Sequence, residues 1–166
     1  MDGEKVSVKA ISDKAEAFEG RMEAFIMDFG GDILWNETIG CRLQTDESAD
    51  LMSVDTALLA GNRLLYVRIL KDGVTVSENT FYTRFPKEYE YGCPEISFEV
   101  QECAEGLELT VSSDRLARGL YLFSDNADDF FEDNYMDLLP GFPRKITVRT
   151  GSTAEEFKTT LKYQTL

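Results

Sequence analysis

The nine residues DNYMDLLPG, at positions 133–141, give the clearest indication of how this chain folds. The Asp133–Asn134 pair has short polar side chains, which hydrogen-bond nearby backbone and hold turns. Tyr135 and the Leu138–Leu139 pair supply apolar surface that fixes such a turn to a core. Pro140–Gly141 suits the central positions of a type II turn, which need a fixed φ followed by a positive φ. We therefore predict a structural corner between strands and not a binding site, with at least one of the two leucines in the core.

Hydrophobic residues alternate with polar residues on both sides of this corner. A period of two is typical of strands with one buried face. No stretch shows a convincing helical stripe, and residues 51–60 fit a helix or a strand preceded by a loop equally well. The fold class is therefore all-β, with about six strands in each half of the chain. The alternating segments are Val6–Ala10, Leu65–Ile69, Ile96–Val100, Leu107–Val111, Ile146–Val148 and Phe157–Tyr163.

Turn residues fall between these strands at hairpin spacing. Gly30–Asp32 and Lys71–Gly73 supply the positive φ that tight hairpin turns require. The segment Pro86–Pro94 is polar and aromatic and is bracketed by prolines, so it predicts the joint between two domains. We expect two tandem antiparallel β-sandwiches, at residues 1–87 and 88–166. The side chains predicted to be buried are Trp35, as a core anchor rather than a ligand platform, Ile69, Phe98 and Val111.

The composition excludes several classes of function. The 166 residues include 17 basic and 31 acidic side chains, and the net charge of −14 would repel a nucleic-acid backbone. No apolar run approaches the roughly 20 residues of a membrane span, and the first residues lack the apolar segment of a signal peptide. The chain has no histidine, which removes the commonest general base and transition-metal ligand. We predict no nucleic-acid partner and no membrane partner.

The three cysteines are Cys41, Cys93 and Cys103. They cannot all pair internally and show no Cys-x-x-Cys spacing, so they indicate neither a zinc site nor a disulfide framework. We expect each of them to be a buried apolar residue. The sequence implies no cofactor.

Six carboxylates lie within residues 125–137, DNADDFFEDNYMD, so calcium has to be considered. An EF-hand loop needs oxygen ligands at its third position and glycine at its sixth. Counted from Asp125, these positions hold Ala127 and Phe130, and counted from Asp128 the third position holds Phe130, so neither register fits. With 31 acids, two carboxylates at glycosidase spacing arise by chance. We predict no catalytic, cofactor-binding or metal-binding residues, and an irregular calcium site stays open as the alternative to a solvated acidic loop.

The corner and its surroundings resemble a known family. DNYMDLLPG, preceded by RGLYLFSDNADDFFE, resembles the D-N-Y/F-F-D-L-L-P-G signature in the C-terminal immunoglobulin-like domain of β-mannosidases and related members of glycoside hydrolase family 2. Residues 2–35, DGEKVSVKAISDKAEAFEGRMEAFIMDFGGDILW, resemble the domain that follows the catalytic barrel in those enzymes, and KEYEYGCPEISFEV resembles their interdomain joint. The chain departs from the family pattern at Met136, where an aromatic is usual, at Phe142, where an acid often stands, and at Ser12–Asp13, where Asn-Asp is usual.

The resemblance implies two immunoglobulin-like sandwiches from the C-terminal region of a retaining exo-β-mannosidase. Hydrolysis in that family is carried out by two glutamates on a (β/α)₈ barrel, which needs about 250 residues by itself. No catalytic residue therefore carries over to this chain, which we expect not to be an enzyme. The implied partners are the catalytic barrel and the N-terminal domains of the same polypeptide, and Met1 is then not the natural start of the protein.

One alternative from a different class stays open. A stand-alone carbohydrate-binding or adhesion module would need exposed aromatic side chains that stack against sugars. Tyr82, Tyr89, Tyr91 and Tyr121 are the candidates, although strand alternation can bury some of them. A free-standing enzyme is not supported, because histidine is absent and no nucleophile motif is present.

Overall fold

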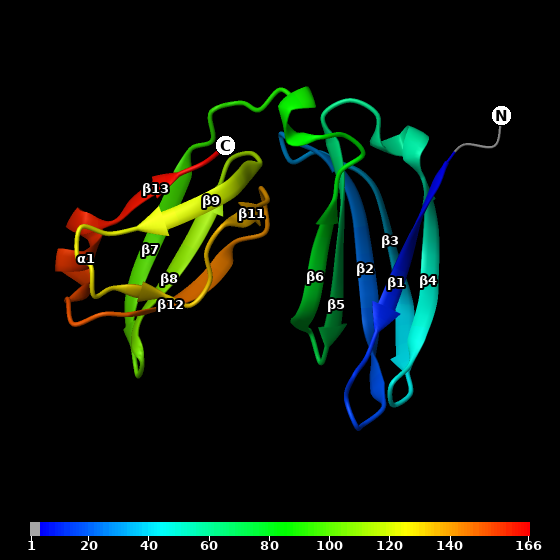
Figure 1. Ribbon diagram of the computed structural model, residues 1–166, viewed down its shortest axis with the longest axis horizontal. Helices are drawn as coiled ribbons and strands as arrows, with labels where there is room; N and C mark the ends of the chain where they lie inside the picture. Colours follow the sequence, from blue (N-terminus) through cyan, green and yellow to red (C-terminus); the bar gives the residue numbers. More distant parts are fainter. Residues whose placement is uncertain (1–3) are drawn as a thin grey trace. The chain divides into compact units, whose positions relative to one another are not determined.

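The structure is a computed structural model that describes residues 4–166, and it is built almost entirely of antiparallel β-strands (Figure 1). The chain divides into two compact units. Unit 1 comprises the residues up to Asp28 together with Asp32–Glu90, and unit 2 comprises Phe29–Gly31 together with Tyr91–Leu166. Each unit pairs two sheets, and the predicted all-β class with two immunoglobulin-like sandwiches is confirmed.

Unit 1 sets a four-stranded sheet, in the order β3-β2-β5-β6, against the two-stranded sheet β1-β4. The predicted hairpins β2–β3 and β5–β6 are both present. At the second turn Asp72 and Gly73 have φ of 52° and 83°, which is the left-handed backbone that a two-residue hairpin turn requires. The elements of this unit are β1 (Lys5–Ile11), β2 (Phe18–Asp28), β3 (Ile33–Leu43), β4 (Ser48–Asp55), η1 (Thr56–Leu59), β5 (Arg63–Lys71), β6 (Val74–Phe81) and η2 (Pro86–Glu88).

The core of unit 1 lies between its two sheets. Met22, Ala24 and Ile26 alternate along β2 toward the second sheet, and each is at most 1% exposed. Trp35 and Ile69 are half-buried and pack against this cluster. Trp35 therefore lies in the packed face of the sheet, as predicted, although it is not fully covered.

Unit 2 sets the four-stranded sheet β10-β12-β8-β7 against the three-stranded sheet β11-β9-β13. Its core contains a cluster to which both sheets and the helix contribute. Val111 is fully buried there, and Phe98 is half-buried against it. The elements are β7 (Ile96–Cys103), β8 (Gly106–Ser113), β9 (Ala117–Phe123), β10 (Phe130–Phe131), β11 (Met136–Leu138), β12 (Arg144–Arg149), α1 (Ala154–Thr160) and β13 (Lys162–Gln164).

The strand predicted at residues 157–163 is wrong over most of its length. Ala154–Thr160 forms the helix α1, and only Lys162–Gln164 is a strand. The reason is a capping box, in which the Thr153 hydroxyl accepts from the Glu156 amide and the Glu156 carboxylate accepts from the Thr153 amide. These contacts satisfy amides that a helix start leaves without partners. Phe157, predicted on a strand face, is instead the fully buried residue of the helix.

The sequence left a helix or a strand open at residues 51–60, and the structure has the end of a strand followed by a short helix. Strand β4 ends at Asp55, and the 3₁₀ helix η1 begins at Thr56. The Asp55 carboxylate caps this helix by accepting from the Ala57 amide at 2.8 Å. Leu59 of the helix is fully buried in the core of unit 1, so the turn is fixed by packing as well as by its cap.

The expectation of three buried cysteines is correct for one of them. Cys41 is fully buried on β3, and this burial raises the pKa of its thiol. Cys93 and Cys103 are exposed free thiols. Cys93 lies between η2 and β7, and Cys103 ends β7 at a tight hairpin, so neither stands at a position that a sheet covers.

Candidate functional site

The corner at residues 133–141 is held by its amide and carboxylate side chains. Asn134 acts as a clamp on β9, since its Oδ1 accepts from the Leu122 amide and its Nδ2 donates to the Leu122 carbonyl, both at 2.7 Å. Asp133 Oδ1 accepts from the Asn134 amide at 2.9 Å. Asp137 Oδ1 accepts from the Gly119 amide at 2.9 Å. These groups bind backbone, as a structural corner requires.

Apolar packing and a turn complete the corner. Leu138 is fully buried in the core of unit 2, which confirms the prediction that one of the two leucines enters it. Leu139 begins the turn, and its carbonyl accepts from the Phe142 amide at 3.1 Å. Gly141 has a φ of +79°, as the third residue of the predicted type II turn requires.

Several acidic side chains among the described residues form ion pairs at the surface. Glu23 is the least exposed of these acids, and Arg21 and Arg68 both contact it. Asp125 and Glu132, from the acidic segment, pair with Lys162 and Arg149. Within residues 4–166 no group of three or more acidic or cysteine side chains is placed to hold a metal ion. The paired acids therefore belong to a solvated surface rather than to a metal site.

The titration of two carboxyl groups also points to structural roles. The pKa of Asp114 is lowered chiefly by a hydrogen bond from the Glu95 amide, and the pKa of Glu156 is lowered by hydrogen bonds from Thr153. A glycosidase general acid requires the opposite, a raised pKa. Neither group has the electrostatics of a proton donor in catalysis.

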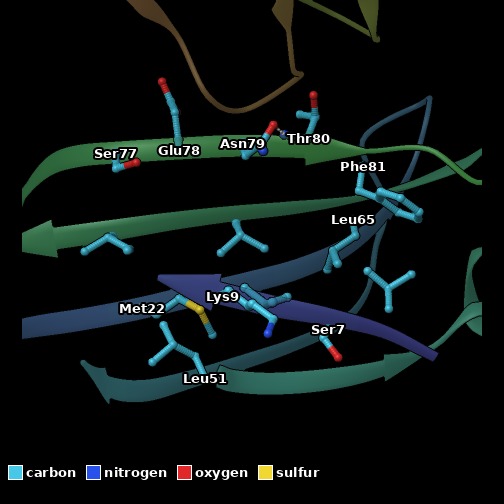
Figure 2. Close-up of a pocket in the computed structure, with 14 residues that line it drawn as sticks. Ser7, Lys9, Met22, Leu51, Leu65, Ser77, Glu78, Asn79, Thr80 and Phe81 are labelled. Atoms are coloured by element: carbon cyan, nitrogen blue, oxygen red, sulfur yellow. Dashed lines mark hydrogen bonds between the residues drawn. The ribbon is translucent and has the colours of Figure 1, made fainter. Parts of the chain in front are cut away.

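A groove opens in unit 1 between the edge strands β1 and β6 (Figure 2). Its volume is about 360 Å³. The apolar floor comes from the inner faces of both sheets, and the rim comes from the two edge strands. The groove exists because the sheet β1-β4 has two strands and faces a sheet of four. Its lining includes Met22, Leu51, Leu65, Val67, Lys9, Ser77 and Phe81.

The chemistry of this groove does not support hydrolysis. Glu78 is the one carboxylate among its lining residues, within the part of the chain that the structure describes. Figure 2 shows the Glu78 side chain pointing away from the groove floor, and its carboxylate accepts from the Tyr66 hydroxyl. Glycoside hydrolysis needs two carboxylates on either side of the scissile bond. The groove is therefore a gap at the sandwich edge, which the sequence pattern did not predict.

Of the four tyrosines considered as a sugar-stacking platform, Tyr82 and Tyr89 belong to unit 1, and Tyr91 and Tyr121 belong to unit 2. Tyr89 is buried at 6% exposure, and the Tyr82 ring packs edge-on against it at 5.9 Å. Tyr91 accepts a hydrogen bond from Arg118 at 2.7 Å. Tyr121 lies on β9 in a stack with Phe123 and Tyr135. The period of two indicates that Tyr121 and Phe123 share a face, but the sequence gives no sign that Tyr135 joins them.

Two family models match the chain. The "Mannosidase Ig/CBM-like domain" matches residues 4–88, and the "Ig-fold domain" of mannosidases matches residues 93–166. Comparison with curated protein sequences finds no match. The fold and its corner define a pair of immunoglobulin-like β-sandwiches without a catalytic domain among the described residues. The chain belongs to the family of mannosidase immunoglobulin-like domains, as the motif resemblance predicted.

Solved structures share this fold. A β-D-mannosidase from Dictyoglomus thermophilum matches 97% of this chain with a TM-score of 0.87 and 21% identity. An exo-chitosanase from Amycolatopsis orientalis matches 96% with a TM-score of 0.62 and 15% identity. The chain spans 20% of the first protein and 24% of the second. The likeness therefore covers the fold of a part of each protein.

Proposed function

We propose that this chain is the non-catalytic C-terminal accessory region of a family 2 glycoside hydrolase. The parent is a retaining exo-enzyme that hydrolyses terminal β-D-mannose residues, and its catalytic barrel and N-terminal domains are the partners of this chain in the same polypeptide. The domain boundary lies between residues 87 and 88. The chain itself supplies no catalytic, cofactor-binding or metal-binding residue.

One observation carries this proposal. The two mannosidase domain models match in succession, over residues 4–88 and 93–166, and leave no segment of this chain for a barrel. The β-D-mannosidase from Dictyoglomus thermophilum supports the same assignment, because 97% of this chain matches 20% of that protein with a TM-score of 0.87. An accessory role also agrees with the contacts of the carboxylates described above, which accept hydrogen bonds from the backbone or form ion pairs.

The test compares this chain with a longer protein that contains it. We expect the 166-residue chain to leave an aryl β-mannoside unhydrolysed, and the reading frame upstream to encode a barrel whose expression together with this chain gives β-mannosidase activity. The longer protein with its two barrel glutamates changed to glutamine is the control for contaminating enzyme. Turnover by the short chain alone that survives repurification would refute the proposal, as would an upstream frame without a barrel.

A further inference from the structure

Unit 2 presents a row of three aromatic rings on one side of strand β9. Tyr121 and Phe123 are two residues apart and so share a face of the strand. Their ring centroids are 5.5 Å apart with an interplanar angle of 18°. The ring of Tyr135 continues the row, with its centroid 4.6 Å from that of Tyr121 at an angle of 16°. Three nearly parallel rings therefore form one stack.

The end of this stack is open to solvent. Tyr135 is 72% exposed, whereas Tyr121 and Phe123 are half-buried. The outer ring gains little from burial, although aromatic residues contribute to folding mainly through the area they bury. The stack on Tyr121 accounts for one face of the Tyr135 ring, and among residues 4–166 its other face has no contact that explains an aromatic side chain at this exposed position.

The backbone at Tyr135 makes this residue type a costly choice for stability. Its φ is +57°, in the left-handed region that glycine and asparagine adopt far more readily than other residues. The clamp of Asn134 on Leu122 and the burial of Met136 hold the position from both sides. A residue kept against a backbone preference, with its side chain in solvent, is a reason to look for a function of that side chain.

A polar hollow of about 330 Å³ lies beside the stack. Tyr121 and Phe123 line it together with Ser124, Asn126 and Asp129. The Asp129 carboxylate accepts hydrogen bonds from the Ser124 hydroxyl at 2.6 Å and from the side-chain amide of Asn126 at 2.9 Å. These side chains are held in place before any ligand arrives, and a few fixed polar groups next to aromatic surface are what small-molecule sites contain.

The charge around the hollow limits the ligand. Asp128 and Asp129 carry negative charge, and Asp125 and Glu132 next to them are already paired with Lys162 and Arg149. Phosphates, sulfates and uronic acids would be repelled. A neutral pyranose suits both parts of the surface, because one face of the ring is made of C–H groups and its rim is made of hydroxyls.

We infer that unit 2 carries a carbohydrate-binding surface, in which the exposed ring of Tyr135 stacks against the C–H face of one neutral pyranose of an oligosaccharide. The side chains of the hollow, which Tyr121 and Phe123 line and Tyr135 does not, bind hydroxyls of a neighbouring unit. The acids of the corner keep their structural role. Tyr135 is the exception to our prediction that the corner is structural and is not a binding site. The inference does not depend on the proposed parent enzyme. A β-sandwich with this surface would bind sugar whichever protein contains it.

The experiment is a titration of the 166-residue protein with β-1,4-linked mannohexaose, cellohexaose and xylohexaose. Calorimetry measures the affinity, and NMR spectra monitor the backbone amide resonances of β9. We expect at least one of these neutral oligosaccharides to bind and to shift the resonances of residues 121–124. Tyr135→Asn removes the ring and suits the left-handed backbone, so it should fold as well as the wild type and bind about tenfold more weakly. Tyr135→Phe keeps the ring and should keep the affinity.

Phe85→Ala is the matched control, because Phe85 is also 72% exposed but lies in unit 1. It should bind like the wild type. The inference is overturned if the wild type binds none of the three oligosaccharides, if Tyr135→Asn binds as tightly as the wild type, or if Phe85→Ala loses binding to the same extent. None of these outcomes bears on the accessory role, which is decided by hydrolysis in the longer protein.

Discussion

The two units close their sandwiches to different degrees. In unit 2 a four-stranded sheet faces a three-stranded sheet and the helix α1, and core residues such as Leu138, Val148 and Phe157 are fully buried. In unit 1 four strands face two, and Val67 and Ile69 on the inner face of β5 are half-buried and line the groove. Apolar and polar side chains alternate along the strands of both units. The size of the smaller sheet, rather than the pattern of the strands, therefore determines how completely a core is covered.

The largest effect should come from the corner leucine of the better-covered unit. Leu138→Ala removes a fully buried side chain from the core of unit 2 and should lower the free energy of unfolding by about 2–5 kcal/mol. Urea denaturation followed by circular dichroism measures this loss. Leu34→Ala, at a position that is 48% exposed in unit 1, is the control and should change stability by less than about 0.5 kcal/mol. A similar loss for both variants would contradict the packing described for the corner.

A matched pair of valines tests the comparison directly. Val148→Ala in unit 2 should cost about 2 kcal/mol, because the two methyl groups that it removes are fully buried. Val67→Ala in unit 1 should cost about half as much, since its side chain already borders the open groove. The same denaturation experiment measures both. Equal costs would mean that the groove floor is as well packed as the closed core.

The polar side of the corner gives a smaller difference. Asn134→Ala leaves both backbone groups of Leu122 without their partner and should cost about 1–2 kcal/mol. Asp133→Asn keeps a side-chain oxygen for its single bond to the Asn134 amide and should cost less than about 0.5 kcal/mol. Thermal melts of the two variants beside the wild type measure this order, and the reverse order would show that Asp133 has a role beyond that bond.

Calcium distinguishes this structural account from a metal site. The wild type should melt at the same temperature in millimolar calcium and in chelator, because the corner acids are engaged with backbone groups. A bound ion would instead raise the melting temperature by mass action. If calcium stabilises the wild type and this gain is lost in Asp133→Asn, the irregular calcium site is the correct interpretation.

The smallest effect of a substitution should be the pH dependence of the helix that closes unit 2. Thr153 lowers the pKa of Glu156, so the charged carboxylate stabilises the fold. This contribution is complete above the unfolded-state pKa of a glutamate, about 4.3, and is lost as the pH falls through the lower folded-state pKa. Glu156→Gln should therefore melt slightly below the wild type at about pH 6 and together with it at about pH 2. A gap that widens in acid would contradict the capping role.

Much of the fold follows from local patterns in the sequence. The strands around Leu65–Ile69, Ile96–Val100 and Leu107–Val111 stand where alternation predicts them, because a side-chain period of two survives in any sheet. Alternation does not predict the helix α1, because Phe157, Leu161 and Tyr163 also fit a period of two. Thr153 and Glu156 do have the spacing of a capping box, which is the local sign of this helix.

The groove and the aromatic stack could not be predicted in the same way. The groove depends on β1 pairing with β4 and on no third strand joining them among residues 4–166, and such pairing is set by contacts between distant segments. The stack joins Tyr121 to Tyr135 across a corner whose conformation depends on the Asn134 clamp. Alternation places a residue on a face of its own strand, but it carries no information on which other segment meets that face.

The single tryptophan of the chain has a practical consequence for studies of folding. Trp35 packs against the core of unit 1, and unit 2 contains no tryptophan. Indole fluorescence therefore reports the loss of structure in unit 1, while far-ultraviolet dichroism reports strands of both units. When the two signals change at different urea concentrations, the domains unfold in separate steps. When they coincide for the wild type and for Leu138→Ala, the domains unfold as one cooperative body, so one pair of spectroscopic curves measures their coupling without any label.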